Sequence, residues 1–230
     1  MNVGPDCFEP AEGLLTTVAW TLADGTTAYA LEGAIFVTGA AVQWLRDGLG
    51  ILVSAAETGP LAESVPDAGG VVLVPAFTGL GSPWWDPYAR GAILGITRGT
   101  TRAHLARATV EAMAYQTRDV VEAMSRAAGH EVQDLRVDGG AAVMDLLLQL
   151  QADQLGVAVH RPADLETTSR GAVYLAGLAE GVWRSLDDVA ASWHEEASFS
   201  PGDPEAADAG HRRWLEAVGR SRGWIGRADR

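Results

Sequence analysis

The chain has 230 residues, 47% of them hydrophobic, and a formal net charge of −13 at pH 7. This acidity argues against nucleic acid and anionic membranes as bulk partners, because like charges repel. The sequence contains no lysine and one cysteine, Cys7, which excludes a Walker A loop, a Schiff-base lysine and an intrachain disulfide. No apolar run reaches the ~20 residues of a membrane span, and the first residues lack the pattern of a signal peptide. We therefore expect a cytoplasmic protein that binds neither nucleic acid nor membrane.

The first part of the chain predicts an antiparallel hairpin followed by a helix. Residues 1–12 are rich in Gly, Pro and acidic side chains and are expected to be irregular. Strands are predicted at 14–20 and 26–36, joined by the hairpin turn signal Asp24-Gly25. Thr38 is a suitable N-cap for a helix over 40–49, so Gly39 lies at a junction between a strand and a helix.

The middle of the chain predicts a long loop and a long helix. Residues 50–69 predict a short helix or a loop, and strands are predicted at 71–74 and 91–97. The segment 77–88 is rich in Gly, Pro and Trp and predicts a loop, for which an aromatic plug and a ligand role are equally open.

The longest helical pattern covers residues 101–128. It contains no Gly or Pro and is followed by Gly129, a residue typical of helix ends. Its apolar positions spread over more than one stripe, which predicts a largely buried helix. Surface placement is the expectation for its polar residues Gln116 and Arg118.

A second junction between a strand and a helix follows. An apolar strand at 135–137 leads into Asp138, Gly139 and Gly140, and then into a helix predicted over 141–155. A helix that begins this way presents free backbone N–H groups and the positive end of its dipole. Glycines also lack the Cβ atoms that would keep a phosphate or a ribose away from the backbone. A tight turn without any ligand explains these residues equally well.

The rest of the chain continues the alternation of strands and helices. A strand is predicted at 157–160 and helices at 171–179, 186–193 and 205–218, before a tail from 220 to 230. The predicted elements begin with strands and continue with alternating strands and long helices. This order predicts an α/β fold with a mixed sheet and helices on both faces. With no repeat and no linker, we expect one domain over residues 13–219.

A family resemblance is carried by the segments 29–34, 39–47, 74–81, 85–91, 91–95, 104–105, 108–111 and 114–120. The segment Ala114-Tyr115-Gln116-Thr117-Arg118-Asp119-Val120 is especially similar to glycerol kinases. Over residues 13–183 the chain resembles the C-terminal half of these enzymes, which belong to the FGGY family of carbohydrate kinases. The resemblance implies an actin-like, ribonuclease-H-like ATPase domain.

The same resemblance implies a nucleotide site. In the family, ATP binds with Mg²⁺ between two domains, and the second domain supplies most of the adenosine side. The residues carried over to nucleotide binding are Gly39, Gln43, Gly139, Gly140 and Met144. Glycerol kinases usually have Asn at the position of Met144, and a methionine cannot form the hydrogen bonds of an amide. It can still pack against a base as a flexible apolar side chain.

The family's catalytic base and glycerol site lie in the N-terminal domain, so no catalytic residue and no metal ligand is assigned in this sequence. The implied function is the ATP-binding half of a glycerol kinase, which transfers the γ-phosphate of ATP to glycerol and gives sn-glycerol 3-phosphate. The alternatives are a non-catalytic truncated module for binding or association, and half of a kinase for another polyol or sugar. If the surface that normally meets the N-terminal domain is apolar, a homo-oligomer is expected.

Overall fold

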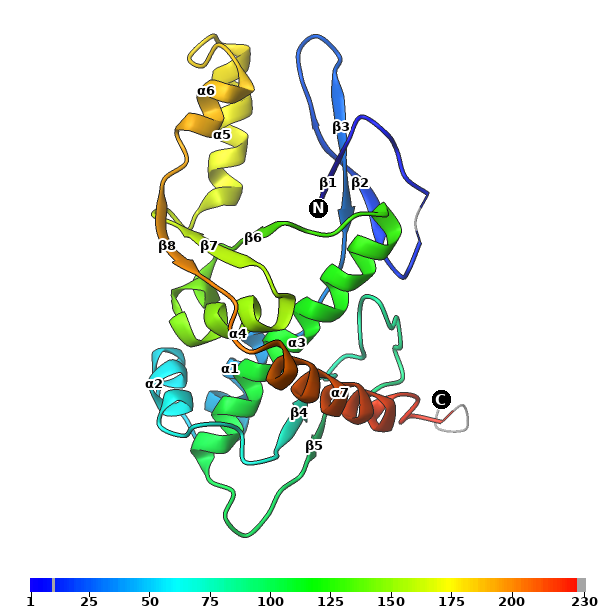
Figure 1. Cartoon of the computed structure of the whole chain (residues 1–230), viewed down its shortest axis with the longest axis vertical. Coiled ribbons are helices and arrows are strands. Elements are labelled where there is room, and N and C mark those ends of the chain that lie inside the picture. The colour runs from blue at the N-terminus through cyan, green and yellow to red at the C-terminus, as the bar shows by residue number, and fades with distance from the viewer. Residues whose placement is uncertain (10, 227–230) are drawn as a thin grey trace.

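The computed structural model describes residues 1–9 and 11–226 and has the predicted α/β class (Figure 1). The strands are β1 (Asn2–Gly4), β2 (Leu15–Thr21), β3 (Thr27–Glu32), β4 (Val72–Val74), β5 (Ala92–Leu94), β6 (Asp134–Arg136), β7 (Ala158–Pro162) and β8 (Glu195–Phe199). The α-helices are α1 (Gly39–Gln43), α2 (Thr58–Glu63), α3 (Arg102–Ala128), α4 (Asp145–Leu155), α5 (Thr167–Ala179), α6 (Leu186–Ala191) and α7 (Pro204–Ser221). Among the described residues, no helix is long and apolar enough to cross a membrane.

The strands form three small sheets. β1, β3 and β2 are antiparallel in that order, and β4 pairs antiparallel with β5. In the third sheet β7 lies between β6, to which it is parallel, and β8, to which it is antiparallel. The mixed pairing expected of the α/β fold is therefore found in the third sheet, which holds the strand that precedes Gly139.

Two strands were not predicted. The segment expected to be irregular, 1–12, contains β1, whose Asn2 pairs with Ala30 of β3. The amino group of Met1 also donates to the carbonyl oxygen of Leu31 over 2.8 Å. β8 pairs with β7 in the same way, after the α6 helix. Both strands are short, and each forms only because it pairs with the edge of a strand far away in the sequence. Local composition therefore does not predict them.

Helix α3 lies along the centre of the molecule (Figure 1). It agrees with the helix predicted over 101–128, and Gly129 ends it in the left-handed conformation with φ of 73°. At its start the side chains of Thr101 and His104 form a reciprocal cap with the backbone. Its residues pack into all three apolar clusters, which explains why its apolar positions are not confined to one stripe.

The expected surface placement of Gln116 is wrong. Only 8% of this residue is exposed, and its side-chain amide donates to the carbonyl oxygens of Val37 and Ala112. Burial is tolerated because both of these hydrogen bonds satisfy its amide nitrogen. Arg118 is also largely buried and pairs with Glu122 and Asp208 over 2.7 Å each.

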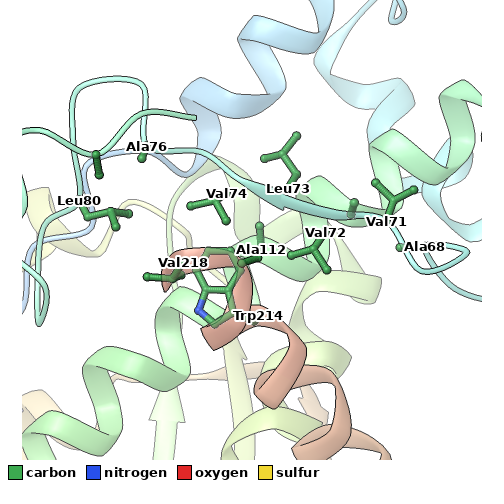
Figure 2. Close-up of a cluster of buried hydrophobic side chains, with 13 residues drawn as sticks. Ala68, Val71, Val72, Leu73, Val74, Ala76, Leu80, Ala112, Trp214 and Val218 are labelled. Atoms are coloured by element: carbon green, nitrogen blue, oxygen red, sulfur yellow. The ribbon is translucent and has the colours of Figure 1, made fainter. Parts of the chain in front are cut away.

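Helix α7 completes the core under β4. Trp214 is fully buried, and its ring lies against Val72, Val74 and Ala112 (Figure 2). The helix begins at Pro204, with the Asp203 side chain accepting a hydrogen bond from the amide of Glu205. It continues to Ser221, three residues beyond the end that was predicted.

The predicted tail from 220 to 230 is therefore helical at its start. Further along, the amide of Gly223 donates to the Asp86 side chain, and the amide of Ile225 donates to the carbonyl oxygen of Tyr88. The last part of that predicted tail, 227–230, lies outside the described residues.

Several predicted helices begin differently in the structure. Residue Thr38 stands at the N-cap of α1, but its side chain makes no capping hydrogen bond. The predicted helix over 40–49 is the five-residue α1 followed by a π-helical turn at Trp44–Gly48. The helix predicted over 171–179 is α5, which begins four residues earlier, at Thr167.

Gly95 offers a test of how closely two backbone segments approach. It has a φ of 79°, and a Cβ atom added to it would overlap the carbonyl oxygen of Gly70. We expect Gly95→Ala to lower the free energy of unfolding by about 2–3 kcal/mol, because the steric overlap adds to the backbone strain. Gly129→Ala is the matched control, with φ of 73° and open space, and should cost about 1 kcal/mol. Urea unfolding measures both values, and equal losses would contradict this account.

Candidate functional site

The first glycine turn connects β3 to α1. Val37 is buried, and its carbonyl oxygen accepts the hydrogen bond from Gln116 of α3. The chain then reaches the surface, where Thr38 and Gly39 are exposed and the amide of Ala41 donates to the carbonyl oxygen of Thr38 over 2.9 Å. A Cβ atom added to Gly39 would meet nothing within 4 Å. The buried side chain of Gln116 thus anchors the residue before the turn, while the turn itself is open to solvent at Gly39.

The second glycine turn follows β6. Gly139 has φ of 80° and ψ of −179°, a conformation that is essentially limited to glycine. Its amide donates to the carbonyl oxygen of Leu165 over 3.2 Å. Cβ atoms added to Gly139 or Gly140 would meet nothing within 4 Å, so both glycines face open space. Within the described residues, the amides of Gly140 and Ala141 donate to no other backbone group, which leaves them available to a ligand.

The helix predicted over 141–155 starts later than expected. Residues Gly140–Val143 form a 3₁₀ turn, and α4 begins at Asp145. The α-helical dipole therefore does not begin at the two glycines. Free amides and the absence of Cβ atoms remain as the features of this turn that suit an anion.

The two turns belong to helices of one apolar cluster. Val42 and Leu45 from the helical segment after Gly39 pack in the same cluster as Leu147 and Leu148 of α4. The helical segments that follow the two turns therefore pack against each other in this one cluster. Four cavities of about 280 to 570 Å³ lie elsewhere, and none of these four is lined by either glycine turn.

The two side chains expected at the site have different environments. Gln43 is exposed, at the last position of α1. Met144 is half-buried and packs against the apolar cluster, and an added Cβ on Gly59 of α2 would lie 3.3 Å from its Cγ atom. The methionine therefore contacts α2 and the apolar cluster.

Sequence reasoning missed two polar residues beside the second turn. Arg161 of β7 donates to the carbonyl oxygen of Ala142 over 3.0 Å and to the carboxylate of Asp145 over 2.7 Å. The hydrogen bond to Asp145 raises the pKa of Arg161, so the guanidinium stays charged. No local signal could have identified this contact, because it joins residues 16 to 19 positions apart.

An acidic side chain also lies beside the second glycine turn. The hydroxyl of Thr167, at the start of α5, donates to the exposed carboxylate of Asp138, just before the two glycines. Among the described residues, no group of three or more His, Cys, Asp and Glu side chains is arranged to hold a metal ion. The charge arrangement therefore does not by itself define a metal site.

The fold defines the class of protein: the chain is an α/β domain of the actin-like ATPase type. A family model for the FGGY family of carbohydrate kinases, C-terminal domain, matches residues 1–180. The chain belongs to this family, as its sequence motifs predicted.

Similar proteins support the same relationship. The chain is 57% identical over 225 residues to glycerol kinase 2 of Thermotoga maritima and 54% identical to the glycerol kinase of Deinococcus radiodurans. The alignments cover 97% of this chain but 45% of each relative, so the chain spans less than half the length of the curated relatives it matches.

Solved structures are also similar. The crystal structure of Plasmodium falciparum glycerol kinase with ADP superimposes with a TM-score of 0.89 and 32% identity. It matches 96% of this chain and 44% of that one. A ligand-bound xylulose kinase from Lactobacillus acidophilus superimposes with a TM-score of 0.77 over 95% of this chain and 44% of that one, and at 21% identity it shows the shared fold.

Proposed function

We propose that this chain is the nucleotide-binding half of a glycerol kinase. The full reaction transfers the γ-phosphate of ATP to glycerol and gives ADP and sn-glycerol 3-phosphate. The observation that supports it best is the pair of glycine turns, both open to solvent and both supported by one apolar cluster. The similar structure of a glycerol kinase with ADP supports a nucleotide as the ligand.

In this proposal each residue has a limited role. Gly39, Gly139 and Gly140 let the phosphates or the ribose approach the backbone, since no Cβ atom stands in the way. The free amides of Gly140 and Ala141 donate hydrogen bonds to a phosphate oxygen. Gln43 offers an exposed amide one helical turn after Gly39, and Met144 contributes an apolar contact beside the base.

In this proposal the N-terminal half of the enzyme supplies the remaining chemistry. Phosphoryl transfer needs an oriented nucleophile and neutralisation of the phosphate charge, which Mg²⁺ provides in kinases. The described residues contain no ready cluster of metal ligands. In our proposal they therefore bind and orient the nucleotide, while deprotonation of glycerol belongs to the other half.

Nucleotide binding can be measured on this chain directly. We expect isothermal calorimetry with ADP to give a Kd of about 1 mM or tighter, because the residues proposed to contact the nucleotide are present. Absence of binding at millimolar ADP would overturn the proposal.

Activity needs both halves. Mixing the chain with the separately expressed N-terminal half of the Thermotoga maritima relative is expected to give glycerol-dependent ADP production, while the chain alone gives none. Nucleotide binding without activity in the mixture would instead favour a non-catalytic binding module, for which the placement of Met144 against α2 is the relevant observation. A panel of polyols and sugars separates glycerol from other substrates.

A further inference from the structure

The second glycine turn is contacted by a side chain of the third sheet, that of Arg161. This residue lies on β7, and only 11% of its side chain is exposed. Its Nη1 atom donates to the carbonyl oxygen of Ala142 and to Asp145, and its Nε atom donates to Glu196 of β8 over 2.7 Å. The guanidinium also lies 5.7 Å from the centre of the Phe199 ring.

These contacts join three separate parts of the chain. Ala142 is inside the 3₁₀ turn that follows the two glycines, Asp145 is the first residue of α4, and Glu196 is on the edge strand β8. A rigid, permanently charged guanidinium can reach all three acceptors at once, and the ammonium group of a lysine cannot reproduce that planar geometry. Arg161 thus links the turn and the start of α4 to the third sheet.

The contact with Ala142 bears directly on the free amides. In the 3₁₀ turn, the amide of Ala142 donates to the carbonyl oxygen of Gly139 and the amide of Met144 donates to that of Ala141. The bond from Arg161 holds the peptide plane that Ala142 shares with Val143. The bond from the Ala142 amide to the Gly139 carbonyl oxygen holds the plane that carries the Gly140 amide. The amides of Gly140 and Ala141 then keep one direction before any ligand arrives, which reduces the ordering cost of binding.

We propose that Arg161 is a positioning residue that pre-forms the Gly139–Met144 turn for a nucleotide phosphate. This inference rests on the proposed function, because it assumes that the turn contacts the nucleotide. Arg161 itself acts through the carbonyl oxygen of Ala142 and the carboxylate of Asp145, so it need not touch the nucleotide.

The test compares Arg161→Met with Glu196→Gln in the full 230-residue chain. Methionine retains an apolar stem but loses every donor, whereas Glu196→Gln weakens only the contact of Arg161 with β8. We expect Arg161→Met to bind ADP about 10-fold to 100-fold more weakly by calorimetry, and Glu196→Gln to bind like the original chain. Arg161→Lys, a milder change, should fall between them and keeps the test valid if the methionine variant does not fold.

Hydrogen exchange supplies a readout that does not depend on a ligand. We expect the amides of Ala142 and Met144 to exchange at least about 10-fold faster in Arg161→Met, while amides in β4 keep their protection. Unchanged exchange at these two amides would overturn the proposal, even in the case that the original chain binds no ADP and the proposed function itself fails. Equal loss of ADP affinity in Glu196→Gln and Arg161→Met would also overturn it, because the effect would then follow general loosening of the sheet.

Discussion

Replacing Asp119 by alanine is expected to lower the free energy of unfolding by about 3–5 kcal/mol, a large part of the total stability of a domain. The side chain of Asp119 is 3% exposed. It accepts hydrogen bonds from the ring nitrogen of His211 over 2.7 Å and from that of Trp214 over 2.8 Å. Trp84 lies within 3.4 Å of the same carboxylate. Removal of the carboxylate leaves these buried donors without an acceptor.

This carboxylate links the central helix to the last one. Asp119 lies on α3, whereas His211 and Trp214 lie on α7, and the ring of Tyr115 stacks on that of Trp214. Urea unfolding measures the loss, with Glu122→Ala as the control on the same helix. Glu122, whose side chain is 42% exposed, pairs with Arg118 and should contribute about 0–1 kcal/mol. A similar loss in both variants would show that the buried hydrogen bonds of Asp119 add nothing beyond an exposed ion pair.

Gly140→Val is expected to weaken ADP binding by about 100-fold or more and to leave the fold intact. No atom lies within 4 Å of a Cβ added to Gly140, and its φ is not in the left-handed region. The change in the free energy of unfolding should therefore stay within about 0.5 kcal/mol. The valine side chain would occupy the open space above the amides of Gly140 and Ala141, where we place a phosphate.

The control for this prediction is Gly219→Val. Gly219 lies on α7, also with no atom within 4 Å of an added Cβ, and far along the chain from both glycine turns. We expect its ADP affinity to equal that of the original chain. Calorimetry and urea unfolding of both variants separate ligand contact from folding. Unchanged ADP affinity in Gly140→Val would remove this turn from the proposed site.

Helix α3 shows what local sequence information can determine. Its length, its end at Gly129 and its broad apolar surface all follow from residues within the helix or next to it. The hairpin of β2 and β3 is similar, because the Asp24-Gly25 turn and two strand-forming segments are adjacent in the chain. The family could also be predicted from the sequence, because its motifs follow one another over most of the chain.

Local sequence information predicted only part of the candidate site. The glycine turns at 39 and at 139–140 were predicted, because a glycine between a strand and a helix is a local pattern, and their role in nucleotide binding stays a prediction. The direction of Met144, the buried bond from Gln116 to Val37 and the contact of Arg161 with Ala142 were not. Each depends on which distant segment supplies the partner.

By itself, the sequence determined the α/β class, the position of the long helix, the two glycine turns and the family, because these depend on periodicity, on turn residues and on motifs read along the chain. Only the tertiary structure decided that β1 and β8 exist, that the segment after Gly140 begins as a 3₁₀ turn, and that Arg161 holds it. These features depend on hydrogen bonds between segments far apart in the sequence, and the free energy of such pairing appears only once the chain has folded.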